Sequence, residues 1–288
     1  MKRSPSPSRS RRIGRAHLAE ILAVLALIVT MVVGTHTSPT GAAVTPTTTP
    51  ATSSRANARY PVGIPSSTEP SGEAPPGAQA LPGYRQTYVQ DFQGATVPEG
   101  WFIYAGIPSP GGHFGISHVV FRSGLMELMT YRDPNWGDRW VTGGICQCGA
   151  SQVYGAYFVR SRITGSGPNE VELLWPLTNK WPPEIDFSET GDKVTGTTSS
   201  VHFGVKNTVV RRSVKANMKQ WHTWGVIWTR SSITYTLDGR VWGVFTQGQD
   251  IPRVRMTLDV EQVTHCPSSD CPTAQQNMYV DWVAVYTK

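Results

Sequence analysis

Between residues 84 and 288 the sequence consists of short runs in which apolar and polar residues alternate, and turn residues separate these runs. The clearest runs are residues 118–128, 154–163, 223–229 and 277–286. Alternation of this kind indicates strands, because successive side chains of a strand point to opposite faces. No helical pattern interrupts them, so we expect an all-β domain, folded as a two-sheet β-sandwich or a barrel.

One hairpin can be placed from the sequence. Residues 233–237 (ITYTL) and 240–244 (RVWGV) alternate on either side of Asp238-Gly239, a dipeptide that suits the tight turn between two twisted antiparallel strands. The composition agrees with a strand-rich chain, since 28 Gly and 22 Pro accompany only 16% charged residues. It argues against a helical bundle, a coiled coil and a wholly disordered protein.

The first 83 residues differ from the rest in charge. They carry eight Lys and Arg against three acids, a balance of +5, which leaves +1 of the total +6 for residues 84–288. The excess of basic residues therefore belongs to a leader. It does not indicate a nucleic-acid partner for the folded part.

Residues 1–43 combine a cationic start with an apolar run at 21–33, the pattern of a secretory signal peptide. The run is short for a bilayer span of about 20 residues, but an uncleaved N-terminal anchor is the alternative. We expect a secreted protein, or one held at the cell surface by its leader, with no other stable membrane contact. Residues 44–83 are rich in Pro, Thr and Ser, and we expect a disordered linker there, before the globular domain at 84–288.

Four cysteines in an exported chain indicate disulfides, because the compartment is oxidising. Cys266 and Cys271 can close a short local loop, whereas a ring between Cys146 and Cys148 is cramped. Cross-links between the two pairs therefore stay open as alternatives. The rival is a zinc site made by the four thiolates, with His265 as a further candidate ligand, although the spacing differs from the usual zinc frameworks.

Three carboxylates, Glu184, Asp186 and Glu189, fall within six residues of the segment WPPEIDFSETGD. On a regular strand Glu189 would point into the core with Ile185 and Phe187, away from the other two acids. A buried, unpaired carboxylate is unfavourable. One extra residue in a β-bulge before Glu189 would return it to the face of the other two acids, so we predict a bulge there.

Such an acidic face could cleave a glycosidic bond. In retaining glycosidases two carboxyl groups about 5 to 5.5 Å apart act as nucleophile and general acid/base, and Glu184 and Glu189 could lean to that separation. Asp186 between them can share a hydrogen bond with the nucleophile and help to keep the acid protonated. The alternative is that the acids only decorate a solvent-exposed face. Tryptophans near in sequence favour a sugar-binding cleft: Trp136, Trp140, Trp175 and Trp181.

These segments together resemble glycoside hydrolase family 16, the laminarinase and lichenase family. The resemblance rests on the motif E-I-D-x-x-E at 184–189, on Leu-Leu-Trp-Pro at 173–176 before it, and on Trp-His-Thr-Trp at 221–224 with Asp238-Gly239 after it. It extends over residues 84–286. It implies a two-sheet β-sandwich of the concanavalin-like jelly-roll type, with a concave substrate cleft, as a catalytic domain at 84–288.

The resemblance also implies roles for single residues. Glu184 is expected to be the nucleophile, Glu189 the general acid/base and Asp186 the assisting carboxylate. Trp175 and Trp181 are similar to cleft tryptophans that stack on sugar rings. The chemistry of the family requires no cofactor.

Three further expectations concern single positions. His202 lies where family members often have a cleft histidine, with an ordinary structural histidine as the alternative. Asp281, in the last strand, resembles a ligand to a structural calcium on the convex side. The chain departs from the family at Glu170 and Glu172, where small or apolar residues are usual.

The function implied by the resemblance is a secreted, monomeric, retaining endo-β-glucanase. Its polysaccharide substrate is expected to be β-1,3-glucan or mixed-linkage β-1,3-1,4-glucan, hydrolysed by double displacement. Three alternatives stay open: a transglycosylase on the same site, a hydrolase of galactans of the agar type, and a non-catalytic glycan-binding module. The last is disfavoured because the chain keeps both glutamates.

Overall fold

The computed structural model describes residues 58–109, 112–267 and 271–288. The leader expected at 1–43 and the first part of the expected linker, 44–57, lie outside these residues. In the described ranges the chain is built of strands, and its helical elements are two short 3-10 turns, η4 (Ile116–His118) and η5 (Pro134–Trp136). None of the helices described there is long and apolar enough to cross a bilayer.

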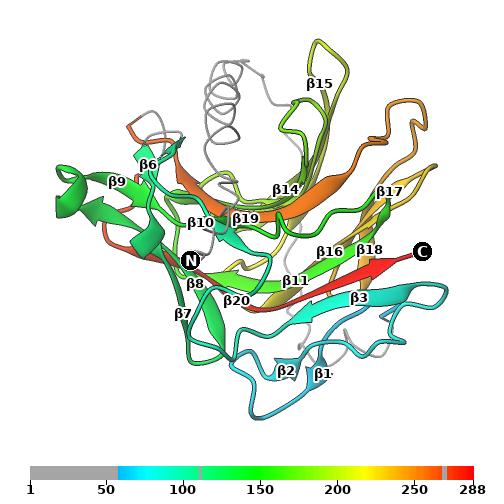
Figure 1. Cartoon of the computed structure of the whole chain (residues 1–288), viewed down its shortest axis with the longest axis horizontal. Helices are drawn as coiled ribbons and strands as arrows, with labels where there is room; N and C mark the ends of the chain where they lie inside the picture. The colour runs from blue at the N-terminus through cyan, green and yellow to red at the C-terminus, as the bar shows by residue number, and fades with distance from the viewer. Residues whose placement is uncertain (1–57, 110–111, 268–270) are drawn as a thin grey trace, which may run out of the picture.

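The first sheet, here called the upper sheet, has seven strands in the order β15-β14-β13-β12-β19-β10-β4, and all neighbours in it are antiparallel. The strands are β4 (Phe102–Ile103), β10 (Gly144–Cys146), β12 (Pro168–Pro176), β13 (Glu184–Glu189), β14 (Gly196–Phe203), β15 (Thr208–Lys215) and β19 (Met256–Thr264). Figure 1 shows that β19 is bent, with its hollow side turned away from the second sheet. We call this side the outer face of the upper sheet.

The second sheet, the lower sheet, has eleven strands in the order β18-β17-β16-β11-β20-β8-β9-β6-β5, with β3 added on β20 and β7 on β8. The strands are β3 (Arg85–Gln90), β5 (Pro108–Ser109), β6 (Gly112–Phe114), β7 (Val119–Arg122), β8 (Leu125–Asp133), β9 (Arg139–Thr142), β11 (Gly155–Ile163), β16 (His222–Trp228), β17 (Ile233–Leu237), β18 (Arg240–Phe245) and β20 (Gln276–Thr287). The two sheets lie face to face in Figure 1. The expected all-β, two-sheet sandwich is confirmed.

The main core fills the space between the two sheets. Trp224 and Val226 of β16 enter it from the lower sheet, and Ile185 and Phe187 of β13 enter it from the upper sheet. All four side chains are buried, and burying a large apolar side chain contributes about 1.5–3 kcal/mol. The alternating apolar residues therefore decide which face of each strand looks inward.

β17 and β18 form the hairpin predicted from Asp238-Gly239. Both turn residues have a positive φ, 47° and 74°, as the tight turn of a twisted hairpin requires. A Cβ at Gly239 would lie 2.6 Å from the Cβ of Ala58 and 2.8 Å from the carbonyl oxygen of Tyr60. Gly239 is therefore needed both for the turn and for the close approach of the N-terminal segment.

Residues 58–83, here called the strap, cover the face of the lower sheet that points away from the main core. The strap contains a small hairpin of β1 (Ile64–Pro65) and β2 (Glu73–Ala74), which lies beneath β3 in Figure 1. Leu81 of the strap, with Tyr60 beside it, packs into a second apolar cluster. The strand residues of that cluster are Ala156, Phe158, Ile227, Trp282, Ala284 and Tyr286. The expected disordered linker is therefore wrong for residues 58–83, because they pack against an apolar face of the sheet.

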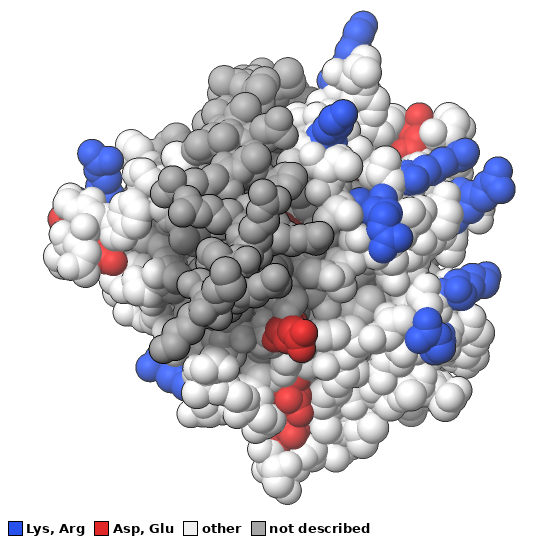
Figure 2. Space-filling view, viewed as in Figure 1, with Lys and Arg blue, Asp and Glu red and all other residues white. Residues whose placement is uncertain are grey.

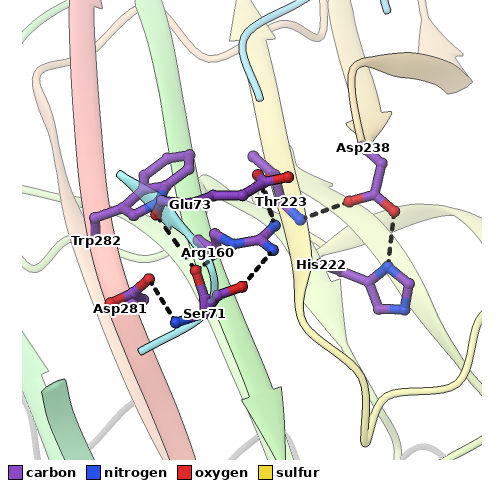
Figure 3. Close-up of polar contacts among 8 residues, drawn as sticks. All are labelled: Ser71, Glu73, Arg160, His222, Thr223, Asp238, Asp281 and Trp282. Carbon is purple, nitrogen blue, oxygen red and sulfur yellow. Dashed lines mark hydrogen bonds and ion pairs between the residues drawn. The ribbon is translucent and has the colours of Figure 1, made fainter. Parts of the chain in front are cut away.

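Polar contacts fix the middle of the strap (Figure 3). Arg160 of β11 donates from Nε to the hydroxyl of Ser71 at 2.6 Å, and its Nη1 lies 3.2 Å from Oε2 of Glu73. The indole of Trp282 donates to the carbonyl oxygen of Glu73 at 3.0 Å, and Asp281 Oδ2 accepts from Ser71 N at 3.2 Å. The side chains of Arg160 and Glu73 are only 8% and 21% exposed, so each charge depends on its partner.

Removing the strap should destabilise the domain. A chain that begins at Tyr84 should have a free energy of unfolding at least about 3 kcal/mol below that of a chain that begins at Ala58, because breaking a buried ion pair costs about 3–5 kcal/mol. Urea unfolding followed by tryptophan fluorescence measures the difference. Glu73→Gln in the longer chain isolates the ion pair. Equal stability of the two chains would contradict a stabilising role for the strap.

The four cysteines form two local disulfides, Cys146–Cys148 and Cys266–Cys271. The expected disulfides are thus confirmed, and the structure decides among the three pairings. The zinc alternative is wrong, because all four sulfurs are used in these bonds. His265, its further candidate ligand, instead places Nδ1 3.2 Å from Asp192 Oδ1, and this partner raises the pKa of His265.

Glu170 and Glu172 of β12 point into the space between the sheets, and neither is exposed. The hydroxyl of Ser161 lies 3.2 Å from Oε1 of Glu170 and 2.6 Å from Oε1 of Glu172, while the second oxygen of each acid has no hydrogen-bond partner. Burial raises the pKa of Glu170 from 4.5 to about 7. Burial also raises the pKa of Glu172 well above its ordinary value, and Glu170 raises it further. The two acids therefore favour their protonated forms.

Glu172→Gln should stabilise the protein increasingly as the pH rises. A carboxyl with a raised pKa in the folded state contributes its full stability below its ordinary pKa, and this contribution is lost as the pH rises toward the folded value. For the Glu170 and Glu172 pair the loss begins above pH 4.5 and continues through about 7. Thermal melts at pH 5 and pH 8 should show a gain for the variant of at most about 3 kcal/mol, mainly at pH 8. The exposed Glu99→Gln is the control, and an equal gain at both pH values would contradict the assignment.

Candidate active site

β13 carries the bulge predicted from the sequence. Opposite it on β12, Leu173 pairs with Asp186 and Val171 pairs with Glu189. The two acids are three positions apart, whereas their partners are two positions apart, so β13 holds one extra residue at this point. Because residues two apart on β12 point to the same face, Glu189 shares the outer face with Asp186. Phe187 stays in the main core.

Glu184 lies on the same outer face, two positions before Asp186, and is 5% exposed. The indole Nε1 of Trp181 donates to its Oε2 at 2.7 Å. The ring of Trp181 in turn lies 5.7 Å from the ring of His202. Trp181, just before the strand, therefore fixes the carboxylate of Glu184 in one orientation.

Asp186 faces a histidine of the neighbouring strand. Nε2 of His202 lies 3.5 Å from Oδ2 of Asp186, and Nδ1 of His202 lies 2.9 Å from the side-chain oxygen of Asn207. His202 is thus held from both ring nitrogens within the acidic cluster. In the described part of the chain, Glu184, Asp186 and His202 form the one group whose three ligand atoms, within 4.8 Å of one another, could hold a metal ion.

Glu189 is less buried than the other two acids and is positioned by Asn169 of β12. Nδ2 of Asn169 donates to Oε1 of Glu189 at 3.2 Å, while Oδ1 of Asn169 accepts from the backbone N–H of Gly191 at 2.7 Å. The second bond fixes the orientation of the amide, so that its N–H groups face the acid. The backbone N–H of Glu189 donates to the hydroxyl of Thr197 at 2.6 Å.

Burial controls the protonation of Glu184 and Asp186. It raises the pKa of Glu184 well above the ordinary value, and Asp186 raises it further, while His202 and the N–H of Trp181 lower it. Burial and then the charge of Glu189 raise the pKa of Asp186, whereas a hydrogen bond with Glu184 lowers it. Two close carboxyl groups joined by a hydrogen bond share a proton.

The structure separates the four candidate tryptophans. Trp181 contacts Glu184 directly. Trp175 lies in the apolar cluster on the outer face, and its indole donates to Asn179 at 3.1 Å. Trp136 and Trp140 belong to η5 and β9 on the arm next to β8. No contact printed for the described residues joins these last two to the acids of β13, so their role in binding sugar stays a prediction.

A cavity of about 520 Å³ adjoins the acids through Trp181. Its walls come from residues 181–183 before β13, residues 203–205 after β14, and Gln249, Asp250 and Pro252. Cavities of about 300–1,000 Å³ are the size that holds small organic ligands. Because Trp181 both lines the cavity and donates to Glu184, a ring bound there lies next to the candidate nucleophile.

Two acids of the outer face, Asp259 and Glu261 of β19, were missed in the sequence. Asp259 pairs with Leu173 and Glu261 pairs with Val171, so both share the face of the β13 acids. The hydroxyl of Tyr104 donates to Oδ2 of Asp259, and burial raises the pKa of Asp259 to about 7. Their alternation with apolar residues in the run MTLDVEQVT was the available signal.

The profile of glycosyl hydrolases family 16 matches residues 114–284, which is more than half of the chain and includes all of β13. The chain belongs to this family. The resemblance noted in the sequence is confirmed, and this family 16 protein is a glycoside hydrolase. Among curated proteins, none matches it.

Several solved structures share the fold of this family 16 enzyme. The catalytic domain of an endo-1,3-β-glucanase (laminarinase) from Thermotoga petrophila RKU-1 is 14% identical, with a TM-score of 0.62 over 71% of this chain and 98% of that one. The endo-β-1,3-glucanase from Pyrococcus furiosus is 18% identical, with a TM-score of 0.61 over 71% and 94%. The non-specific endo-β-1,3(4)-glucanase SCLam is 18% identical, with a TM-score of 0.63 over 82% and 98%. At these identities the likeness shows the fold.

The residues around Asp281 do not fit the calcium ion that the resemblance implies. Calcium takes six to eight oxygen ligands, but Oδ2 of Asp281 already accepts the backbone N–H of Ser71. Glu69, which raises the pKa of Asp281, accepts the side-chain amide of Gln93 through Oε2. The guanidinium of Arg160 supplies positive charge to the same segment. N–H donors and an arginine surround one remaining oxygen, so we derive no role for calcium.

Trp181 should set the pH at which the enzyme loses activity on the acidic side. Its N–H lowers the pKa of Glu184, so Trp181→Phe should raise that pKa and move the acidic limb of kcat/KM to higher pH. A shift of about one pH unit is expected, because a hydrogen bond to a charged group contributes about 1.5–3 kcal/mol. Trp175→Phe is the matched control, since its indole donates to Asn179 instead. The pH profiles of the two variants check this, and an unmoved limb in Trp181→Phe would contradict it.

Proposed function

We propose that the protein is a secreted, monomeric endo-β-glucanase that hydrolyses β-1,3-glucan or mixed-linkage β-1,3-1,4-glucan with retention of configuration. The observation that carries the proposal is the bulge in β13, because it brings Glu184, Asp186 and Glu189 onto one face of the upper sheet. A pair of glutamates on one face, with a third acid between them, suits the double-displacement mechanism.

The substrate class is supported by what the fold neighbours are described to do. They include laminarinases and endo-β-1,3(4)-glucanases, and one SCLam variant was crystallised with 1,3-β-D-cellobiosyl-glucose at its active site. Export is supported by the signal-peptide pattern of residues 1–43 and by the two disulfides, since such bonds persist in oxidising compartments.

In the first step, the carboxylate of Glu184 attacks the anomeric carbon while Glu189 gives its proton to the glycosidic oxygen. The bond between the anomeric carbon and that oxygen breaks, the leaving chain departs as an alcohol, and a glycosyl ester forms on Glu184. The hydrogen bond from Trp181 holds Glu184 in place for the attack.

In the second step, Glu189 is a carboxylate and takes a proton from a water molecule. The oxygen of that water attacks the same carbon, and the ester bond to Glu184 breaks. Two inversions at one carbon leave the configuration unchanged. Asn169 donates to Glu189, a bond that stabilises the carboxylate form needed at this stage.

Asp186 keeps the proton balance between the two glutamates. Its hydrogen bond with Glu184 and its charge interaction with Glu189 place it in contact with both. When Asp186 holds the shared proton, it can donate to Glu184 and leave the nucleophile ionised. His202, 3.5 Å from Asp186, stabilises the negative charge of the pair when it is protonated.

Glu184→Gln and Glu189→Gln should each lower kcat on laminarin by roughly 10²–10⁴-fold or more, the usual contribution of one positioned acid or base. Glu172→Gln is the matched control, because Glu172 is a buried acid of the adjacent strand that faces the core. It should keep wild-type activity. Wild-type rates in either of the first two variants would contradict the proposal.

The anomeric form of the first product tests the stereochemistry, and proton NMR can follow it during hydrolysis. Retention gives the β-anomer first. The same reactions with added oligosaccharide, read by mass spectrometry, separate hydrolysis from transglycosylation, because only the latter lengthens the acceptor. An α-anomer as first product would overturn the double displacement.

A further inference from the structure

The acids of β19 face the acids of β13 across one strand. Because β12 lies between them, two rows of paired positions cross the outer face: Asp186–Leu173–Asp259 and Glu189–Val171–Glu261. Each row places two acids about 10 Å apart, twice the spacing of neighbouring strands. A glycan that crosses the strands from β13 would therefore place another of its rings over β19.

Asp259 and Glu261 are reached from the same side as the catalytic candidates. They are 7% and 8% exposed, against 5% for Glu184 and 3% for Asp186, whereas the core-facing Glu172 has no exposed surface. A substrate that can touch Glu184 can thus also touch the acids of β19.

Glu261 has no hydrogen bond or ion pair within the described part of the chain. Asp259, in contrast, accepts from Tyr104 and from the hydroxyl of Thr257. Burial raises the pKa of Glu261 well above its ordinary value, and nearby carboxylates raise it further: Asp259, Glu184, Asp186 and Glu189. A buried acid among other acids, without a partner, is unfavourable. A cation brought by a ligand would complete the site.

A metal ion is not the cation that fits at β19. In the chain as described, three ligand atoms come within 4.8 Å of one another only at Glu184, Asp186 and His202, and neither Asp259 nor Glu261 belongs to that group. Asp259 and Glu261 are spread along a strand. This arrangement suits a charged group on an extended molecule that lies across the sheet.

The protein's own cations gather elsewhere. Figure 2 shows most of the visible Lys and Arg side chains toward the right of this face, at the end of the molecule with β15 and β17. Arg211, which lowers the pKa of Asp186, belongs to β15 at the far edge of the upper sheet. The β19 side of the outer face is therefore left acidic.

We propose that the site over β19 binds a β-glycan ring that carries a free primary amine, with Glu261 as the partner of the ammonium group. A neutral hydroxyl there leaves the acids uncompensated, and an N-acetyl group removes the charge and adds bulk. Tyr104, with Ile107 and Phe114 of the same outer-face cluster, supplies apolar surface for the ring. The inference rests on the proposed function only for the course of the glycan, and it deepens that function by naming an amino-sugar polymer as a substrate class.

The test measures binding by calorimetry to two matched sets of oligosaccharides. One set is β-1,3-linked glucose with a primary amine on every ring, and the other is β-1,4-linked glucosamine; each is compared with its N-acetylated form. Because every ring carries the amine, one amine lies over β19 in any register. We expect at least one amine form to bind the wild type at least tenfold more tightly at low salt, with an advantage that shrinks as salt screens the charges.

Glu261→Gln should abolish the preference for the amine, and Glu172→Gln, which alters a core-facing acid, should keep it. If Glu261→Gln does not fold, the salt dependence and the contrast between amine and N-acetyl forms in the wild type still decide. Equal binding of both forms in both sets would overturn the inference. Laminarin hydrolysis is measured separately: an enzyme that cleaves laminarin without preferring amines refutes only this inference, and one that prefers amines without cleaving laminarin refutes only the proposed function.

Discussion

The extra residue in β13 is the constraint on which the active face depends. The strand must bury Ile185 and Phe187 in the core and present its acids on the other side. Strict alternation achieves this for Glu184 and Asp186 but would turn Glu189 inward. One additional residue reverses the phase of the strand. The pairing of Glu189 with Val171 then fixes the second half of the strand as firmly as Phe187 fixes the first.

The acids of the outer face weaken the fold that carries them. Raised pKa values mean that ionisation at neutral pH opposes folding, and this holds for Glu184, Asp186, Asp259 and Glu261. Single donors limit the loss. Trp181 donates to Glu184 and Tyr104 to Asp259. The stability that offsets the loss comes from elsewhere, chiefly from the core between the sheets and from the strap.

The features predicted correctly from the sequence are those whose signal is local. Alternation gave the strands, Asp238-Gly239 gave the turn, and the phase of the acids against Ile185 and Phe187 gave the bulge. The acids of β19 were missed for the opposite reason. Their importance depends on β19 lying beside β12, about 90 residues away along the chain, and strand order is not contained in the alternation of either strand. The pairing of two adjacent half-cysteines likewise depended on the turn that joins them.

The strap was missed because its own residues gave no sign of folding, while the sheet beneath it did. In β20 the core-facing positions are Met278 and Val280 before Asp281, and Val283 and Val285 after it. The spacing of two becomes three at this point, and the pairing with β11 shifts at the same place. This second one-residue irregularity leaves Trp282 on the outside, where its indole donates to the strap. An apolar ring on an outer face requires cover, so the irregular phase of β20 already implied a segment such as the strap, just as the irregular phase of β13 implied an outward-facing third acid.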